Sequence, residues 1–361
     1  MYIKSIELNN FRNYDSEIIY LDNGLNVIVG DNAQGKTNLL ESVYLSSIGK
    51  SPRTTKEKEL IKWNSTFAKI TIEYVKVGSN HKKLEIYLSN SQNKSIKING
   101  FYLKKISQLL GEIYTVYFSP DELNIVKSGP SERRKFIDIA ISQFDKNYFY
   151  NLNKYYEILE QRNKLLKSSN NYKTISDTLC IWDEQLAQFG AKLIYTRLGF
   201  INILSSIAHD IHSDLTDGKE NFRIEYVGVQ STDIKDIEKK LIQALLDSRE
   251  KDISLGYTNV GPQRDDIKLI VNEIDIRSFG SQGQQRTVAL SLKIAEMEVI
   301  TNEAHDTPIL LLDDVLSELD EKRQSKLIEK ISKYQTILTT TQYSLSQDCK
   351  IIYINSGKQQ N

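Results

Sequence analysis

The chain has 361 residues, which is enough for about two domains, each with its own hydrophobic core. Hydrophobic residues make up 40% of it and charged residues 26%, as in an ordinary globular protein, and 47 basic residues balance 47 acidic ones. Overall charge therefore does not indicate a nucleic-acid partner, and any basic surface has to be a local patch.

Cysteine usage and hydropathy argue against several other classes. Cys180 and Cys349 are isolated and lack a C-x-x-C partner, which argues against a disulfide framework and a structural zinc site. No segment approaches the roughly 20 apolar residues that span a bilayer, and residues 1–8 alternate like a strand rather than forming a signal peptide. We expect a cytoplasmic protein with no membrane partner.

A phosphate-binding motif follows the first predicted strands. After strand-like segments at residues 3–8 and 17–21, a short apolar strand is predicted over 25–29. Residues 30–37 read Gly-Asp-Asn-Ala-Gln-Gly-Lys-Thr, which matches the Walker A pattern G-x-x-x-x-G-K-[ST], and helical spacing follows over 38–45. Glycines let backbone N–H groups point at phosphate oxygens, and the helix adds the partial positive charge of its N-terminus.

This loop is predicted to bind ATP and Mg²⁺. Lys36 would act as a catalytic residue that bridges the β- and γ-phosphates, and the Thr37 hydroxyl would bind Mg²⁺. The alternative, a glycine turn with a chance Lys-Thr pair, is disfavoured by the flanking strand and helix. The predicted nucleotide-binding residues of the loop are Gly30, Asp31, Asn32, Ala33, Gln34, Gly35, Lys36, Thr37 and Asn38.

A polar loop and an antiparallel sheet are predicted next. The loop at 49–55 contains Lys50 and Arg53, and two interpretations are open. One of these cations contacts the nucleotide or a partner, or both are solvent-exposed side chains of a polar loop. Residues 67–118 are mostly strand-like, with an Asn-Gly turn at 99–100. Their lysines are candidates for DNA phosphate contacts, although a charged solvent face explains any single one more simply; they are Lys82, Lys83, Lys94 and Lys97.

From residue 120 the apolar spacing becomes helical. Apolar residues recur at three-and-four spacing along one helix, and after a polar linker at 168–171 a second helix places Leu179, Leu186, Leu193, Phe200 and Ile207 seven apart. Trp182, Phe189 and Ile203 follow members of that series by three residues, which completes a heptad pattern. The pattern predicts an antiparallel coiled-coil arm.

Polar residues of the arm are open to two interpretations. Arg162, Thr196 and Asp210 occur at the predicted seam, where they serve as register devices or edge positions. The run Arg133-Arg134-Lys135 lies where a helix leaves the head, and it either clamps a phosphate backbone or forms a solvated basic turn.

A second phosphate-binding turn is predicted near residue 281. Residues 279–286, Phe-Gly-Ser-Gln-Gly-Gln-Gln-Arg, precede an apolar helix over 288–299. The turn is similar to the signature loop of ABC-type ATPases, with Gln282 in place of the usual first glycine. In that class the loop reaches the γ-phosphate held by a second subunit. The residues predicted to bind nucleotide in this way are Ser281, Gln282, Gly283 and Gln284.

A Walker B motif is predicted at residues 307–314. The apolar strand ends in Asp313, which would hold Mg²⁺, and Asp314, which would polarise the attacking water, and both are predicted catalytic residues. The alternative is a strand-ending turn that caps the next helix. Residues 315–320 are similar to the D-loop of the same ATPases, and the last strand places Thr341 or Gln342 where relatives carry a switch residue.

The separation of the motifs predicts the architecture. Walker A lies near residue 36 and Walker B near residue 313, with the coiled coil between them, as in SMC-like ATPases. We predict an α/β, ABC/SMC-type P-loop ATPase head with an appended antiparallel β-sheet and a short helical coiled-coil arm. The expected parts are 1–119 (Walker A and the β-rich part of the head), 120–250 (the arm) and 251–361 (signature loop, Walker B and D-loop).

Together these residues resemble the RecF family of bacterial recombination mediators, nearly end to end. Besides the motifs, the resemblance rests on Asn10–Tyr14, Gly49–Thr54, Gly129–Arg134, Glu160–Asn163 and Gly261–Asp266. Pro52 and Gln263 depart from the pattern, because relatives often carry histidine there. The resemblance also implies that Arg12 belongs to the nucleotide site.

The resemblance implies a function. ATP and Mg²⁺ would drive a head-to-head homodimer that binds duplex DNA, favours junctions with single-stranded gaps, and helps RecR and RecO load RecA in gap repair and the SOS response. Weak, DNA-stimulated ATP hydrolysis would act as a release switch. An ABC-type transporter ATPase subunit is the alternative, disfavoured by the arm that separates the two Walker motifs and by the absence of a switch histidine. The short arm argues against a third interpretation, an SMC-like structural protein.

Overall fold

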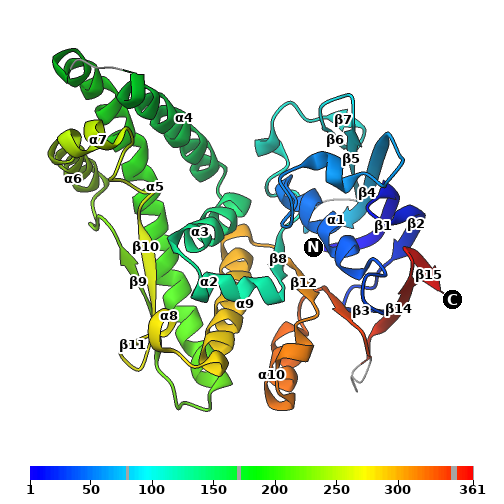
Figure 1. Ribbon diagram of the computed structural model, residues 1–361. Coiled ribbons are helices and arrows are strands. Elements are labelled where there is room, and N and C mark those ends of the chain that lie inside the picture. Colours follow the sequence, from blue (N-terminus) through cyan, green and yellow to red (C-terminus); the bar gives the residue numbers. More distant parts are fainter. Residues whose placement is uncertain (79–80, 169–171, 343–347, 361) are drawn as a thin grey trace. The chain divides into compact units, whose positions relative to one another are not determined.

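The computed structural model describes residues 1–78, 81–168, 172–342 and 348–360, which divide into two compact units (Figure 1). The first unit comprises Met1–Leu123 and Leu290–Asn361, so that both ends of the chain contribute to it. The second unit comprises Asn124–Ala289. The three-part division by motifs, with boundaries after residues 119 and 250, stays a prediction.

The first unit contains a six-stranded sheet that carries both Walker motifs. Its order is β15-β14-β3-β13-β12-β8, and all neighbours are parallel except β14 and β15. Because β13 pairs with both β3 and β12, the loop after β3 and the carboxylates at the end of β12 lie at the same edge of the sheet. The strands are β3 (Leu25–Val29), β8 (Thr115–Phe118), β12 (Ile309–Asp313), β13 (Thr336–Thr340), β14 (Lys350–Asn355) and β15 (Lys358–Gln360).

A second six-stranded sheet of the first unit is entirely antiparallel. Its order is β2-β1-β4-β5-β6-β7. Alternation along β4 buries Ile70 and Ile72, while Lys69 on the opposite face pairs with Glu85 of β5 at 2.8 Å. The strands are β1 (Tyr2–Phe11), β2 (Tyr14–Tyr20), β4 (Phe67–Val75), β5 (Lys82–Ser89), β6 (Ser95–Ile98) and β7 (Phe101–Tyr102).

Helix α1 (Lys36–Ile48) packs against strands of both sheets, β4 in one and β8, β12 and β13 in the other (Figure 1). It is buried on almost every side, and its Ser42 and Ser46 hydroxyls donate to backbone carbonyls one turn back. The other helices of the unit are η1 (Glu57–Leu60), η2 (Ile106–Gln108), η3 (Pro120–Leu123), η4 (Leu316–Glu318) and α10 (Glu321–Ile331). Helix α9 (Gln282–Ala304) begins in the second unit and ends in the first.

The second unit is organised along the 44-residue helix α5, which packs against α4, α6 and β9 (Figure 1). A three-stranded antiparallel sheet of order β11-β10-β9 completes it. Its helices are α2 (Asn124–Lys127), α3 (Pro130–Phe144), α4 (Lys146–Ser168), α5 (Tyr172–Leu215), α6 (Ile234–Asp247), α7 (Arg249–Leu255) and α8 (Ile276–Phe279), and its strands are β9 (Phe222–Val227), β10 (Asp266–Val271) and β11 (Ile274–Asp275).

The heptad pattern is only half correct. Leu179, Leu186, Leu193 and Phe200 are buried as predicted, but Trp182 and Phe189 are half-buried and Ile203 is 42% exposed. Helix α5 packs against α3, α4, α6 and β9 rather than against a single helix, so it buries a broad face with the 3.6-residue period of a globular helix. The predicted linker at 168–171 falls mostly outside the described residues.

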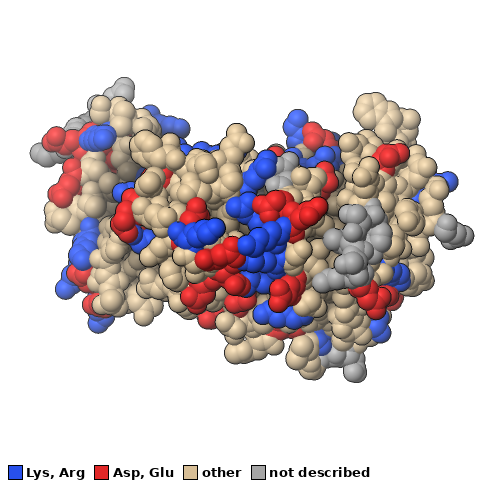
Figure 2. Space-filling view, turned by 90° about the horizontal axis from the view of Figure 1, so that it is seen from below, with Lys and Arg blue, Asp and Glu red and all other residues tan. Residues whose placement is uncertain are grey.

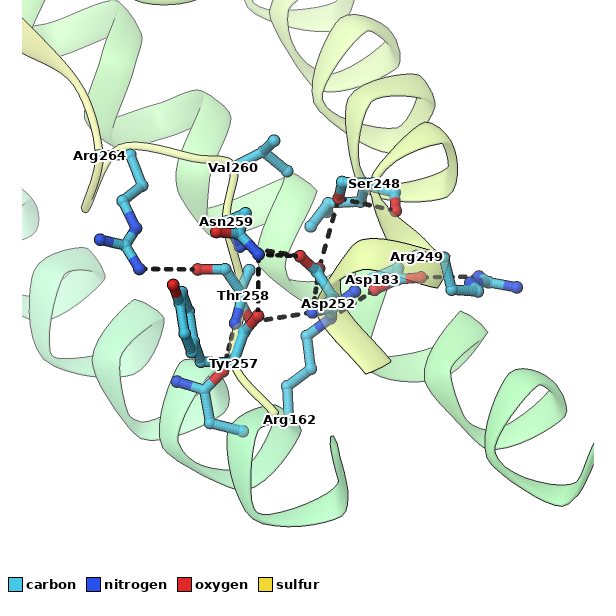
Figure 3. A network of polar contacts seen from close by, with 12 residues as sticks. Arg162, Asp183, Ser248, Arg249, Asp252, Tyr257, Thr258, Asn259, Val260 and Arg264 are labelled. Carbon is cyan, nitrogen blue, oxygen red and sulfur yellow. Dashed lines mark hydrogen bonds and ion pairs between the residues drawn. The ribbon is translucent and has the colours of Figure 1, made fainter. Parts of the chain in front are cut away.

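Arg162 is the centre of a buried polar cluster rather than an edge position on the seam (Figure 3). Its Nε donates to Asp183 at 2.7 Å, and its Nη1 donates to Asp252 at 2.7 Å and to the Thr258 hydroxyl at 2.8 Å. Arg249 also pairs with Asp183, so the cluster joins α4, α5, α7 and the loop after α7. Asp210 is exposed, as expected of an edge position.

Arg133 also has a structural role, which its place in a basic run does not predict. It is 2% exposed, and its Nε and Nη2 bind the two carboxylate oxygens of Asp266 at 2.7 and 2.9 Å. Its Nη1 donates to the backbone carbonyl of Ser128 at 2.8 Å. These bonds fix the start of α3 to β10, so Arg133 is not available to a phosphate backbone. Among the described residues, no helix is both long enough and apolar enough to cross a membrane.

Candidate nucleotide-binding site

The Walker A loop connects β3 to α1, and two of its glycines lie so close to neighbouring groups that no side chain fits there. A side chain at Gly30 would collide with the Ile354 carbonyl oxygen, which lies 2.3 Å from the position of the missing Cβ. Gly35 has φ +114, and a Cβ there would collide with the Asn13 amide. As the residue before α1, Gly35 offers no capping side chain, so the first amides of the helix are left for a ligand.

Lys36 and Thr37 begin α1 at this loop. Lys36 is 8% exposed, and its ammonium group donates to the backbone carbonyls of Gly30 and Asp31. Burial lowers the pKa of Lys36, while the carboxylates of Asp314, Asp313 and Asp31 oppose that shift by favouring the charged form. The Lys36 side-chain nitrogen thus lies among backbone carbonyl oxygens, which phosphate oxygens can replace as its partners.

Asp313, at the end of β12, meets the Walker A loop directly. Thr37 donates from Oγ1 to Asp313 Oδ1 at 2.8 Å, although the two residues are 276 positions apart. Thr339 of β13 donates to the same oxygen at 2.8 Å, and Tyr117 of β8 donates to Oδ2 at 3.1 Å. Three hydroxyl groups thus fix the orientation of one buried carboxylate.

Asp314 takes a backbone conformation that is uncommon for a residue other than glycine. Its φ is +52, and its amide donates to the Thr339 hydroxyl at 3.0 Å. Thr339 therefore binds both acidic residues of Walker B, as a donor to Asp313 and as an acceptor for Asp314. The two switch candidates, Thr341 and Gln342, lie exposed after β13.

Arg12 lies beside the loop in a network with a buried glutamate. Its Nε and Nη2 both bind Glu41 of α1 at 2.8 Å, and its Nη1 donates to the Glu59 carbonyl at 2.9 Å. Arg53 approaches the same Glu41 and donates to the Asn38 side chain at 3.0 Å. A direct contact between Arg12 and nucleotide stays a prediction, because in this structure the guanidinium binds protein groups.

Two residues next to Arg12 support the loop itself, and neither belongs to a motif that predicts this role. Asn13 donates to the Gln34 carbonyl at 2.9 Å and accepts from the Asn38 amide at 2.9 Å. Tyr14, which is fully buried, donates to the Gly35 carbonyl at 3.0 Å. Both lie in the Asn10–Tyr14 segment, so its likeness to the family was the signal that could have identified them.

The predicted signature residues form a regular turn in the second unit. Ser281 precedes α9, its Oγ accepts from the Gln284 amide at 3.2 Å, and its own amide donates to Gln284 Oε1 at 3.0 Å. This reciprocal pair is a capping box. Gln282 and Ser281 are exposed, whereas Gly283 and Gln284 are half-buried.

The side chains at the Walker motifs fit ATP with Mg²⁺. Thr37 and Asp313 bring a hydroxyl and a carboxylate oxygen to one point, which are the oxygen ligands that Mg²⁺ prefers. Among the described residues no group of three or more His, Cys, Asp and Glu side chains could hold a metal by itself. In P-loop proteins generally, phosphate oxygens and water complete the coordination of the magnesium ion.

The basic residues considered for DNA are mostly engaged with protein groups. Lys82 pairs with Glu112 at 2.8 Å, Lys94 binds Glu57 and the Gly49 carbonyl, and Lys97 lies over the Tyr102 ring at 4.4 Å. On the face drawn in Figure 2, basic and acidic side chains of the described residues lie interspersed. Their distribution agrees with the balanced composition and does not identify a DNA surface.

The chain matches known proteins over most of its own length and most of theirs. A family model described as the RecF/RecN/SMC N terminal domain matches residues 2–360. The chain is 44% identical over 341 residues to the DNA replication and repair protein RecF of Clostridium novyi (strain NT), which covers 94% of this chain and 93% of that protein. It is 43% identical over 366 residues to the protein of the same name from Clostridium acetobutylicum, with 99% of each covered.

Solved structures also match the fold of this chain. The recombination mediator protein RecF-ATPrS in the RecFOR pathway matches with a TM-score of 0.92 at 37% identity, covering 99% of this chain and 97% of that one. An Smc head bound to the C-winged helix domain of ScpA matches with a TM-score of 0.59 at 17% identity, which shows likeness of fold alone. The predicted α/β head of the ABC/SMC type is confirmed.

Proposed function

Because the chain belongs to the RecF family, we propose that it is an ATP-driven switch that acts in DNA replication and repair. In this proposal, ATP with Mg²⁺ drives a homodimer that binds duplex DNA at junctions with single-stranded gaps. Slow, DNA-stimulated hydrolysis then releases the DNA. The observation that carries the proposal is the meeting of Thr37 and Asp313 at the start of α1, with Lys36 beside them.

The residues of the Walker motifs would have different roles at the nucleotide. Lys36 would neutralise charge on the β- and γ-phosphates, and the amides that begin α1 would bind the same oxygens. Thr37 and Asp313 would hold Mg²⁺, and Asp314 would orient the attacking water. When bound, ATP supplies the phosphoryl group that is transferred to water, and Mg²⁺ withdraws charge from its oxygens. Asp313 is held in place for this role by the hydroxyls of Thr339 and Tyr117.

Dimerisation would complete the site. We infer that Ser281, Gln282, Gly283 and Gln284 bind the γ-phosphate of the nucleotide held by the partner subunit. The capping box keeps the Ser281 hydroxyl and the amides of the turn in one arrangement, which lowers the ordering cost of binding a phosphate. ATP would thus favour the dimer, and hydrolysis would remove the group that both subunits bind.

The partners are proposed from the relatives. Two solved relatives are named recombination mediator proteins of the RecFOR pathway, one of them with ATP. We therefore propose that the dimer works in the cytoplasm on gapped DNA and helps RecR and RecO to load RecA. Contacts with phosphates would make duplex binding fall steeply as salt rises.

The decisive measurement is the molar mass of the purified chain by light scattering, with and without ATP–Mg²⁺, and then with duplex DNA added. We expect a monomer without nucleotide and a dimer that retains DNA with ATP. Lys36→Ala should remove nucleotide binding and all ATP-dependent association, because the ammonium that neutralises the phosphates is lost. Intact ATP-driven dimers of this variant would overturn the Walker A assignment. A wild-type monomer under every condition would overturn the switch proposal and favour a heteromeric or transporter ATPase.

A further inference from the structure

The signature turn is joined to the end of helix α5 through one carboxylate, that of Glu220. Gln284 of the turn donates from Nε2 to Glu220 Oε1 at 2.9 Å. The other oxygen, Oε2, lies 2.9 Å from Nε2 of His212, in the last turn of α5. All three residues belong to the second unit.

The side chains of His212 and Glu220 are both held in place by the protein around them. The His212 side chain is fully buried and packs against the Phe222 ring, with the ring centres 5.1 Å apart. Glu220 lies between α5 and β9, in a short connection whose Gly218 amide donates back to the Ser213 carbonyl at 2.7 Å. The Glu220 side chain is 19% exposed, so it is largely shielded from water. A hydrogen bond to such a partly buried carboxylate is stronger than one between neutral groups.

The chemistry of Glu220 also determines which way Gln284 points. An ionised carboxylate only accepts hydrogen bonds, so it selects the NH₂ end of the Gln284 amide. The carbonyl end, Oε1, then faces the Ser281 amide, which donates to it at 3.0 Å. A reversed Gln284 would set its carbonyl against the carboxylate and its NH₂ against the Ser281 N–H. Glu220 therefore stabilises the capping box of the signature turn without itself being part of it.

We propose that Glu220 is a positioning residue for the signature turn and ties that turn to the end of α5. It keeps Gln284 in the orientation that closes the capping box, and so holds the Ser281 hydroxyl and the first amides of α9 ready for the partner's nucleotide. This inference rests on the proposed function, in which the turn binds ATP across the dimer. A change at the end of α5 would reach the turn through the same carboxylate.

The test measures ATP-dependent dimerisation by sedimentation for the wild type, Glu220→Ala and Glu220→Gln. Loss of a hydrogen bond to a charged group corresponds to a factor of about ten to a hundred. Because this bond acts by ordering the turn within one chain, Glu220→Ala should raise the dimer dissociation constant by up to that factor. Glu220→Gln keeps an acceptor oxygen and should recover part of the loss. ATP binding to the monomer should be unchanged in both variants, because Glu220 does not belong to the Walker motifs.

The matched control is Glu225→Ala, which removes a more exposed carboxylate of the same unit that pairs with Arg223 at 3.0 Å. It should dimerise as the wild type does. Amide hydrogen exchange over residues 281–287 of the nucleotide-free chain gives a second readout, and Glu220→Ala should exchange faster there than Glu225→Ala. Wild-type dimerisation and exchange in Glu220→Ala would overturn the role of Glu220. If the wild type failed to dimerise, the proposed function would fall, and unchanged exchange in Glu220→Ala would separately overturn the positioning role.

Discussion

Arg162→Met should destabilise the second unit more than any other single change in its polar cluster. The substitution keeps most of the side-chain volume but removes three hydrogen bonds, those to Asp183, Asp252 and Thr258. The Arg162 side chain is 0% exposed, and those of Asp183 and Asp252 are 3% and 0% exposed, so water cannot replace the lost partner. Breaking a buried pair from one side costs about 3–5 kcal/mol.

The remaining contacts decide where in that range the loss falls. Asp183 keeps Arg249 at 2.7 Å, and Asp252 keeps the amide and the side chain of Asn259 at 2.9 and 3.0 Å. Neither carboxylate is left without a donor, so we expect the lower end of the range, about 3 kcal/mol. That is a large share of the roughly 5–15 kcal/mol by which folded domains are stable. Adding Asp252→Asn should recover part of the loss, because it removes one of the two buried charges.

Urea unfolding followed by tryptophan fluorescence can isolate this unit. The chain has two tryptophans, and Trp63 of the first unit is 87% exposed, so Trp63→Phe should cost little and leave Trp182, beside Asp183, as the reporter. Arg249→Met is the control, because it leaves Asp183 paired with Arg162 and should cost about 1 kcal/mol. If Arg162→Met lowered the free energy of unfolding no more than Arg249→Met does, with the dependence on urea concentration unchanged, the hydrogen bonds of Arg162 would not stabilise the unit.

Three further predictions concern the site and its surroundings. Ser281→Arg should spare ATP binding to the monomer, measured by calorimetry, yet block ATP-dependent dimerisation; loss of monomer binding would show that the turn does not act across subunits. Tyr117→Phe removes one donor to Asp313 and should raise the Mg²⁺ concentration for half-maximal ATP binding about fivefold, the effect of about 1 kcal/mol, whereas an unchanged midpoint would contradict a positioning role. Burial raises the pKa of Asp265 from 3.8 to about 6, so the folded chain binds this proton more tightly than the unfolded chain. The resulting stabilisation of the folded chain is complete below about pH 4 and is lost as the pH rises through about 6, a fall of about 3 kcal/mol in the free energy of unfolding. Asp265→Asn should flatten this part of the pH profile, measured by urea unfolding. An unaltered pH profile would assign the fall to other groups.

The nucleotide site is recognisable from sequence because its chemistry is local. A loop of backbone amides requires glycines at fixed spacing, and a buried strand that ends in two carboxylates is an unusual pattern for any other purpose. Residues 30–37 and 307–314 could therefore be identified before their contact was known. The alternation of β4 and β5 likewise predicted which side chains are buried, since a strand has a period of two.

The partners of those residues were decided only by the tertiary structure. Tyr117 and Thr339 bind Asp313 because β8 and β13 flank β12 in the sheet, and the sequence of neither strand specifies that order. The buried face of α5 departs from the heptad because several neighbours cover the helix, whereas the heptad pattern assumes one partner helix. Arg162 and Arg133 are basic residues in sequence, yet both are buried among carboxylates that other elements supply. A sequence encodes residue type and period directly, but the burial and pairing of a charge depend on which distant elements the fold places beside it.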